Sequence, residues 1–198
     1  MKACLDMLDT CGLYQGFEAE FLQQSTEFYQ YLSLSKLEEL GVAKYVVFAR
    51  EVIQAESKLV SHYVSDKNTF LKAVENLEKV LIVAYKTMLL QDFPGVLEMP
   101  GCFLTLFQFF KLCGIEREFN FAFKKHVITC AVAIFNKETS SADKMAELYN
   151  YKLEVTKLQK EVLQADTLAL HIKTAFEEFV NDKSRQNEYA QHLVCHVH

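Results

Sequence analysis

Apolar residues recur along most of this chain at the three-, four- and seven-residue steps of amphipathic helices. One such stretch contains Phe17, Phe21, Phe28 and Leu32. A second contains Val42, Tyr45, Val46, Ala49, Ile53 and Val60. Strict alternation of apolar and polar residues, which is typical of half-buried strands, does not extend over any useful length. The pattern therefore predicts an all-α protein.

Glycine and proline residues divide this pattern into predicted helices. The helices are expected at residues 1–9, 16–33, 42–64, 66–91, 101–113, 115–137, 142–164, 167–181 and 186–196. Asp66, Ser141 and Asp166 are predicted N-caps, because a short side-chain oxygen can accept from the free N–H groups of a first turn. Helices 66–91 and 115–137 are apolar on more than one face and are predicted to be central, whereas 142–164 has a charged face for solvent.

Composition and charge exclude several classes of protein. With 198 residues, of which 51% are hydrophobic, the chain is neither disordered nor fibrous. Its 26 acidic against 21 basic residues argue against nucleic-acid binding, and Lys124-Lys125-His126 is interpreted as a solvated helix face. No window approaches the roughly 20 apolar residues of a membrane span, and the N-terminus does not resemble a signal peptide. We expect an intracellular protein, cytoplasmic or nuclear, that binds no membrane.

Cysteine and histidine residues offer one candidate metal site. The six cysteines form no C-x-x-C pair and are predicted to be buried thiols without a disulfide: Cys4, Cys11, Cys102, Cys113, Cys130 and Cys195. His192, Cys195 and His196 share one face of the last predicted helix and could bind zinc. The alternative, which we favour, is a helix that packs through Leu193 and Val194. No metal or cofactor is therefore predicted.

Catalytic motifs are missing from the sequence. It contains no phosphate loop, H-E-x-x-H or G-x-S-x-G pattern. Glu177 and Glu178 are adjacent, so on a helix they point about 100° apart and cannot converge on one substrate atom. The aromatic run 103–110 could line a ligand site, but its helical spacing favours a core face made of Phe103, Leu106, Phe107 and Phe110, with Thr105, Gln108 and Lys111 opposite. We expect a non-enzymatic binding or scaffolding protein.

One N-terminal stretch resembles a known family. Residues 14–29, YQGFEAEFLQQSTEFY, are similar to the entrance of the second helical repeat of cullins, Y-x-x-x-F-E-x-x-F-L-x-x-T-x-x-F-Y, with a one-residue adjustment near Gly16. The matching positions are Tyr14, Phe17, Glu18, Phe21, Leu22, Phe28 and Tyr29. Residues 42–46 resemble the family's V-S-E-Y-L through Tyr45, and 57–64 resemble R-V-x-x-Y-L through Tyr63.

Further cullin-like patterns follow in the family's order. Residues 103–110 are similar to D-L-x-x-M-Y-x-L-F, and 168–181 to F-x-x-A-L-x-x-A-F-E-x-F-I-N through Phe176, Phe179 and Asn181. Glu188-Tyr189 resembles the P-E-Y/L-L segment, so the resemblance covers about residues 13–193. The chain departs from the pattern at Leu32, at Lys36 and at 192–194.

The resemblance implies an elongated stack of long-helix bundles, with residues 1–114 as a second repeat and 115–198 as a third, packed as one rod. It implies a rigid, non-catalytic stalk of a cullin-RING ubiquitin ligase whose partners are other proteins of that assembly. Nothing resembles the adaptor-docking repeat or the RING-binding region. Residues 1–8 and 188–197 are candidate caps for the ends of the stack. A stand-alone decoy, and a helical metal- or ligand-binding protein that uses the C-terminal His/Cys cluster, are the alternatives.

Overall fold

The structure is a computed structural model and describes residues 2–64, 66–99, 101–163 and 166–182. All regular elements within these ranges are helical, which confirms the predicted all-α class. In chain order they are α1 (Lys2–Thr10), α2 (Tyr14–Tyr63), α3 (Lys67–Leu81), the 3-10 turn η1 (Val83–Tyr85), α4 (Lys86–Leu89), α5 (Phe93–Glu98), α6 (Cys102–Leu112), α7 (Glu116–Phe135), α8 (Ser141–Lys157), the π-helical segment η2 (Leu158–Leu163) and α9 (Asp166–Val180).

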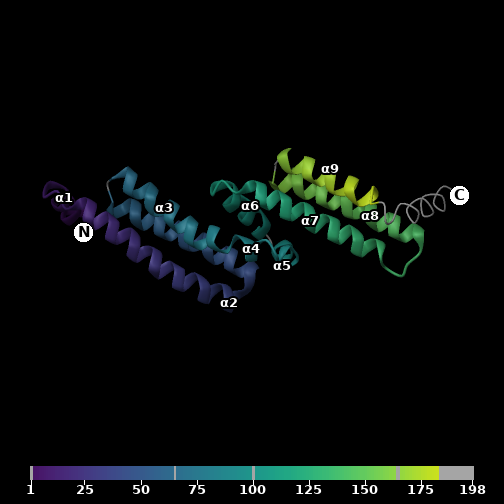
Figure 1. Cartoon of the computed structure of the whole chain (residues 1–198), viewed down its shortest axis with the longest axis horizontal. Coiled ribbons are helices and arrows are strands. Elements are labelled where there is room, and N and C mark those ends of the chain that lie inside the picture. Colours follow the sequence, from purple (N-terminus) through teal and green to yellow (C-terminus); the bar gives the residue numbers. More distant parts are fainter. Residues whose placement is uncertain (1, 65, 100, 164–165, 183–198) are drawn as a thin grey trace. The chain divides into compact units, whose positions relative to one another are not determined.

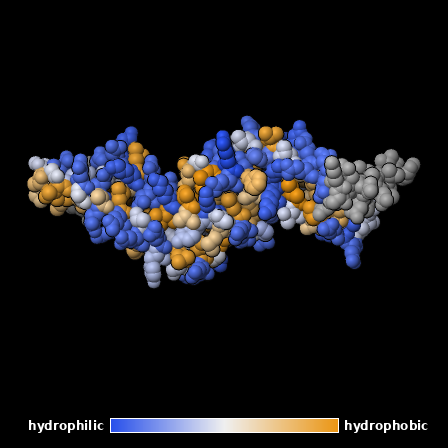
Figure 2. All heavy atoms as spheres, viewed as in Figure 1, coloured by the Kyte–Doolittle hydropathy of each residue, from blue (hydrophilic) through white to orange (hydrophobic). Residues whose placement is uncertain are grey.

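The chain divides into two compact units, unit 1 from Met1 to Glu116 and unit 2 from Arg117 to His198. Most of the visible surface of the described helices is hydrophilic, with smaller apolar areas between (Figure 2). The assignment of residues 1–114 and 115–198 to a second and a third repeat, packed as one rod, stays a prediction.

Unit 1 is built on a reversal inside α2. Gly41 has φ 71° and ψ 169°, a backbone conformation that favours glycine because it has no Cβ. Figure 1 shows the chain turning back at this point, and the side chains of Tyr29 and Glu56 interact across the reversal. The two halves of α2 and the following α3 thus form an up-down-up set of three helices.

The predicted loop between residues 33 and 42 is wrong, because the first half of α2 continues as far as Gly41. Residues 34–40 read LSKLEEL, which contains mostly good helix formers. Leu37 is buried, and Lys36 pairs with Glu39 at 2.6 Å on the outer side. This short stretch is therefore amphipathic, with Leu37 facing the core and the Lys36–Glu39 pair facing solvent.

The predicted single helix 66–91 is also wrong. It ends at Leu81 and is followed by a 3-10 turn and the short helix α4. Val80, Leu81 and Ile82 are all buried, and successive residues of a regular α-helix point about 100° apart, so the core surrounds the chain here and the backbone tightens. The run 80–82 is buried, as the prediction of a central segment requires, whereas Leu71, Lys72, Glu75 and Lys79 give α3 an exposed face.

A short helix that the sequence reading missed follows α4. The glycine and proline residues of segment 92–101 predict a break between helices, but residues 93–98 form α5. Asp92 caps it by accepting from the Gly95 N–H at 3.1 Å, and Pro94 occupies the first turn, where its missing N–H costs nothing. Phe93 is buried and lies 6.1 Å from the ring of Phe103, which attaches α5 to α6.

The predicted core role of the aromatic run is confirmed in α6, where Phe103, Leu106, Phe107 and Phe110 are buried. The opposite side is less polar than expected, because Thr105 and Phe109 are buried as well. Only Gln108 and Lys111 of the three residues assigned to that side are exposed. The run therefore packs into unit 1 around most of the helix circumference.

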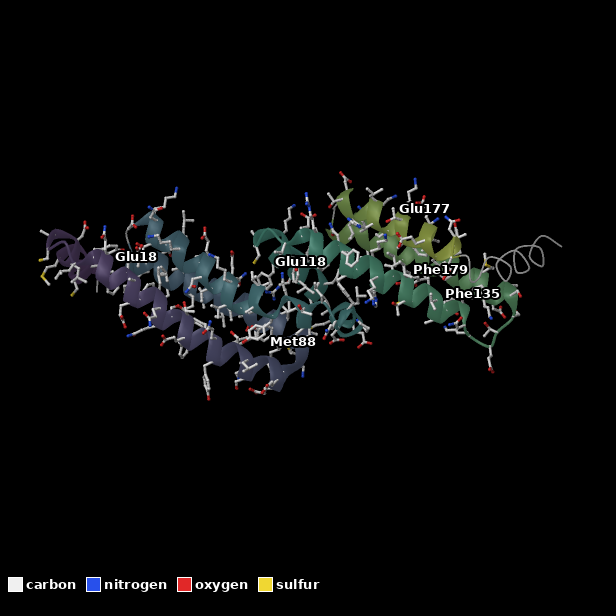
Figure 3. All side chains as sticks on the ribbon, viewed as in Figure 1. Glu18, Met88, Glu118, Phe135, Glu177 and Phe179 are labelled. Carbon is white, nitrogen blue, oxygen red and sulfur yellow. The ribbon has the colours of Figure 1, made fainter. Side chains whose placement is uncertain are left out.

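Unit 2 contains α7, α8 and α9, which bury apolar residues between them. Ala131, Phe135 and Phe179 form a buried cluster against which Val132 and Leu148 pack. Phe135 and Phe179 lie 6.3 Å apart, edge to face, and both are labelled in Figure 3. α8 keeps its predicted solvated face, with Val155 its buried position.

Three local predictions in unit 2 need correction. The N-cap of α8 is Ser140, which accepts from the Asp143 N–H at 3.2 Å, and not Ser141. α9 begins at Asp166, so this residue lies in the first turn instead of preceding it. Of the stretch 124–126 only Lys125 is exposed as predicted, because His126 is half-buried and Lys124 pairs with Glu178, with 17% of the lysine side chain exposed.

The cysteines are less uniformly buried than predicted. Cys102 is buried, Cys113 and Cys130 are half-buried, and Cys4 and Cys11 are exposed. Burial raises the pKa of the Cys113 thiol to about 11. Cys195 lies outside the described residues, as does the predicted helix 186–196. Within the described ranges, no helix has both the length and the apolar character needed to cross a membrane.

Candidate functional site

The cullin-like residues at the start of α2 hold the first turn of α3. The Tyr14 hydroxyl donates to Thr69 Oγ1 at 3.1 Å, and Thr69 Oγ1 lies 2.6 Å from Glu18 Oε1. The Lys72 ammonium lies 2.8 Å from Glu18 Oε2. Thr69 is fully buried, so its hydroxyl is the centre of a polar contact between two helices whose sequence positions differ by more than 50 residues.

Asp66 completes this contact as the N-cap of α3. Its Oδ2 accepts from the Thr69 N–H at 2.9 Å and lies 2.8 Å from Thr69 Oγ1, as the prediction of an N-cap requires. The Thr69 N–H holds the pKa of the Asp66 carboxyl below its ordinary value. Lys72, with Thr69, lowers the pKa of Glu18, and Glu18 in turn raises the pKa of Lys72. Glu18 thus stabilises the contact between α2 and α3, and Asp66 stabilises the first turn of α3.

A cavity of about 510 Å³ lies beside this cluster and is lined in part by Asp9, Gln15 and Asn68. Because Glu18 and Asp66 at its wall are already hydrogen-bonded, their oxygens act as structural acceptors. Among the residues that the structure describes, no three His, Cys, Asp or Glu side chains gather in a way that could hold a metal ion. The candidate zinc ligands His192, Cys195 and His196 lie outside those residues.

Two further contacts join the three helices of unit 1. Asn76 of α3 donates to the Leu22 carbonyl at 3.2 Å and to Thr26 Oγ1 at 2.6 Å. The Tyr45 hydroxyl donates to the Leu81 carbonyl at 2.8 Å, and its ring is fully buried. Burial raises the pKa of Tyr45 to about 12, so the phenol stays protonated and able to donate.

The other cullin-like residues of α2 divide between core and surface. Phe17 and Phe21 are half-buried and stack at 6.0 Å, while Tyr29 is buried, with burial raising its pKa. Phe28 is 60% exposed and therefore does not serve the core position that its spacing predicts. Tyr63 is half-buried against the His62 ring at 4.9 Å.

The C-terminal cullin-like residues lie on α9 or directly after it. Phe179 belongs to the core of unit 2, and Phe176 is buried beside Tyr151, with ring centroids 6.3 Å apart. Asn181 follows the helix, is exposed, and donates its N–H to the Glu177 carbonyl at 2.9 Å. The adjacent acids do not converge, because Glu178 pairs with Lys124 and Glu177 with Lys173.

Several polar residues that fix unit 1 were missed by sequence reasoning. These are Thr69, Asn76, Arg50 and Thr105, the last two being joined at 3.2 Å between Arg50 Nη1 and Thr105 Oγ1. A usable signal existed for Thr69, which falls four residues before Ala73 on the buried stripe that continues to Leu77. A polar residue at a core position of a helical pattern requires a partner when it is buried.

Comparison with known proteins bears on this arrangement. The sequence matches the Cullin alpha solenoid domain over residues 1–198. Cullin-4 of Dictyostelium discoideum is 22% identical over 198 residues, covering 96% of this chain and 24% of that protein. Cullin-5 of Caenorhabditis elegans is 29% identical over 79 residues, covering 39% of this chain and 10% of that protein. The chain thus spans about a quarter of the first relative and a tenth of the length of the second in these alignments. With a match to the cullin solenoid along its entire length, the chain belongs to the cullin family, whose members are scaffold proteins.

Proposed function

We propose that this chain is a non-catalytic stalk segment of a cullin-type ubiquitin ligase. In this role it binds other proteins of the ligase assembly and keeps the substrate-receptor end and the ubiquitin-transfer end apart. A fixed separation raises the effective concentration of substrate near the charged enzyme without any chemistry in the stalk. Membership of the cullin family supports the proposal.

The observation that carries the proposal is the set of polar contacts along unit 1. At one end of α3, Tyr14 and Glu18 contact Thr69, and in the middle Asn76 contacts Leu22 and Thr26. Towards the other end, Tyr45 donates to the carbonyl of Leu81. Three directional contacts spaced along a helix, in addition to the apolar core, resist both sliding and rotation of that helix against its neighbours.

The chemistry of the same residues supports a structural role. Glu18 accepts from Lys72 and Thr69, and Asp66 accepts from a backbone N–H, so neither carboxylate is poised as a general base. The buried phenol of Tyr45 is likewise committed to a carbonyl. The groups with the strongest local interactions in unit 1 thus stabilise helix packing.

A chimera tests the proposal. The aligned stretch of the Dictyostelium Cullin-4 is replaced by residues 1–198 of this chain, and ubiquitin transfer is measured in the reconstituted assembly together with binding at both ends. We expect transfer to stay within about tenfold of the parent, since the spacing is preserved. A chimera that assembles at both ends and yet fails to support transfer would contradict the stalk role.

A softened chimera tests the rigidity itself. Asn76→Ala removes the middle contact of α3, and Thr129→Ala, an exposed hydroxyl that donates to a carbonyl of its own helix, is the matched control. The first variant should lower transfer while leaving binding at both ends unchanged, and the control should leave both unchanged. Equal transfer by the two variants would show that these contacts are not needed for the function.

A further inference from the structure

A groove runs along one side of the α8–α9 pair in unit 2. It has a volume of about 490 Å³ and is lined by residues of α8, η2 and α9. On the α9 side, the buried Ile172 and Phe176 and the more exposed Val180 contribute apolar surface, and Lys173 and Glu177 also line this side. Val180 is 48% exposed, so the groove opens to solvent instead of closing into a core cavity.

The apolar surface continues beyond the groove onto α8. Tyr149 and Leu153 are exposed by 62% and 50% and lie four residues apart. Tyr149 lies three positions before the groove residue Lys152, and Leu153 lies three positions before the groove residue Thr156. Residues three and four apart are neighbours on a helix surface, so this pair extends the groove wall. An apolar area of this kind, bordered by polar groups, is typical of a protein interaction site.

Lysines dominate the charge around the groove. Lys152, Lys160 and Lys173 line it, against the single carboxylate of Glu177. Lys152 Nζ lies 6.0 Å from the centroid of the Phe176 ring, so one ammonium is held over the apolar base. Glu177 Oε1 lies 3.7 Å from Lys173 Nζ and offsets part of that charge, which leaves a positive border.

The length of the groove suits a helix. From Ala169 to Val180 the α9 wall spans about 16 Å at 1.5 Å per residue, which corresponds to three turns of a second helix laid alongside. An amphipathic helix would place apolar residues at every third or fourth position against Ile172, Phe176 and Val180, and its flanking residues would face the lysines.

We propose that this groove binds an acidic amphipathic helix of a partner protein. The positive border selects against basic helices by like-charge repulsion. Residues 183–198 of this chain are a poorer match, since they contain Lys183 and Arg185 but one acidic residue, Glu188. The site adds a specific recruitment point to the stalk and does not depend on the rigidity proposed above.

Binding of a synthetic probe tests the assignment. The probe is a fluorescent peptide of about 16 residues with leucines at helical spacing and glutamates elsewhere, and its control has lysines in place of the glutamates. Fluorescence anisotropy with the full chain should show binding of the acidic peptide and not of the basic one. Affinity should fall as salt is raised from about 50 mM to about 500 mM.

Matched variants locate the site. Lys152→Glu and Lys173→Glu change exposed groove residues and should each weaken binding about fivefold, whereas Lys125→Glu on the exposed part of α7 should leave the affinity unchanged. Equal effects of all three variants, or equal binding of the two peptides, would overturn the proposal. Binding that appears only after removal of residues 183–198 would also overturn it, because the groove would then belong to the chain's own C-terminal segment.

Discussion

Unit 1 and unit 2 hold their helices together by different means. In unit 1 the buried Thr69 and the half-buried Asn76 make directional contacts between helices. In unit 2 the described ion pairs keep at least one partner largely exposed: Lys137, after the end of α7, pairs with Glu147 of α8, and Lys124 of α7 pairs with Glu178 of α9. The apolar cluster around Phe179 provides buried contacts. Exposed ion pairs add at most about 1 kcal/mol to the free energy of unfolding. Loss of one partner of a buried polar contact destabilises the fold more, because the other group is left buried without a hydrogen bond.

This difference predicts that the two units fail for different reasons. Unit 1 should be sensitive to loss of single hydroxyl or amide groups, because each makes a partly buried hydrogen bond to another helix. Unit 2 should be sensitive to loss of apolar volume and tolerant of changes to surface charge. Hydrogen exchange measured by mass spectrometry reports on both units in one sample and can therefore separate the two kinds of failure.

The largest effect is expected from Phe179→Ala in unit 2. Phe179 is 2% exposed and packs on Phe135, so its truncation leaves a cavity in the core and should lower the stability of unit 2 by about 4 kcal/mol. Exchange should accelerate across α7, α8 and α9 while α2 and α3 keep their protection. Leu170→Ala, at an exposed position of the same helix, is the control and should cost less than about 0.5 kcal/mol. Equal loss of protection in both units would contradict the comparison.

A smaller effect, about 2 kcal/mol, is expected from Thr69→Val in unit 1. The substitution keeps the shape of the side chain but removes the hydroxyl that Tyr14, Glu18 and Asp66 share. Chemical denaturation followed by exchange of α2 and α3 peptides measures the loss. Thr129→Val removes an exposed hydroxyl from unit 2 and should be close to neutral. A valine variant with unchanged stability would show that the shared hydroxyl adds nothing to the packing.

The smallest effect concerns pH and should appear in unit 2 first. Burial lowers the pKa of His126 from its ordinary value of 6.5, so the folded state favours the neutral ring. The unfolded chain binds the proton more readily, and unit 2 should therefore lose stability as the pH falls from about 7.5 to about 5.5. Glu18 and Asp66 have lowered pKa values and ordinary values of 4.5 and 3.8, so unit 1 should weaken only at lower pH.

Exchange measured across this pH range checks the order of the two losses. In the His126→Gln variant, the exchange protection of unit 2 should depend less on pH above about pH 5, and that of unit 1 should depend on pH as before. Glu18→Gln should alter the pH dependence of protection in unit 1 alone. If unit 1 lost its exchange protection at a higher pH than unit 2, the assignment of the first loss to His126 and of the later loss to Glu18 and Asp66 would be wrong. A response of unit 2 that persists in the glutamine variant would remove His126 as its cause.

Sequence reasoning was sufficient where local signals and packing agree. The helical class, the cap at Asp66 and the core face of α6 followed from spacing and capping chemistry alone. The cullin patterns also located Tyr14, Glu18 and Tyr45, although they did not identify the atoms that these side chains contact. Spacing places residues on a helix face, but the partner comes from another part of the chain.

The errors arose where tertiary packing decides the backbone. Residues 66–91 have continuous helical character, yet the buried run 80–82 interrupts the α-helix. Segment 92–101 contains breakers, yet a capped turn and the burial of Phe93 make a helix there. Phe28 has core spacing but lies at the surface. The cap at Asp92 and the position of Pro94 are a local signal for α5, but the burial of Phe93 and the exposure of Phe28 depend on other parts of the chain.

The reversal at Gly41 has a consequence for how the chain can vary in length. A Cβ at this position would meet nothing within 4 Å, so the constraint is torsional, set by φ. The link is one residue long, and an extra residue continued as helix would rotate the second half of α2 by about 100°, which would turn Tyr45 away from Leu81. The exposed connection 136–140 between α7 and α8 is longer, so it can take up an added or lost residue without a change in helical phase. Insertions and deletions should therefore accumulate at 136–140, while the helical phase set at Gly41 is kept.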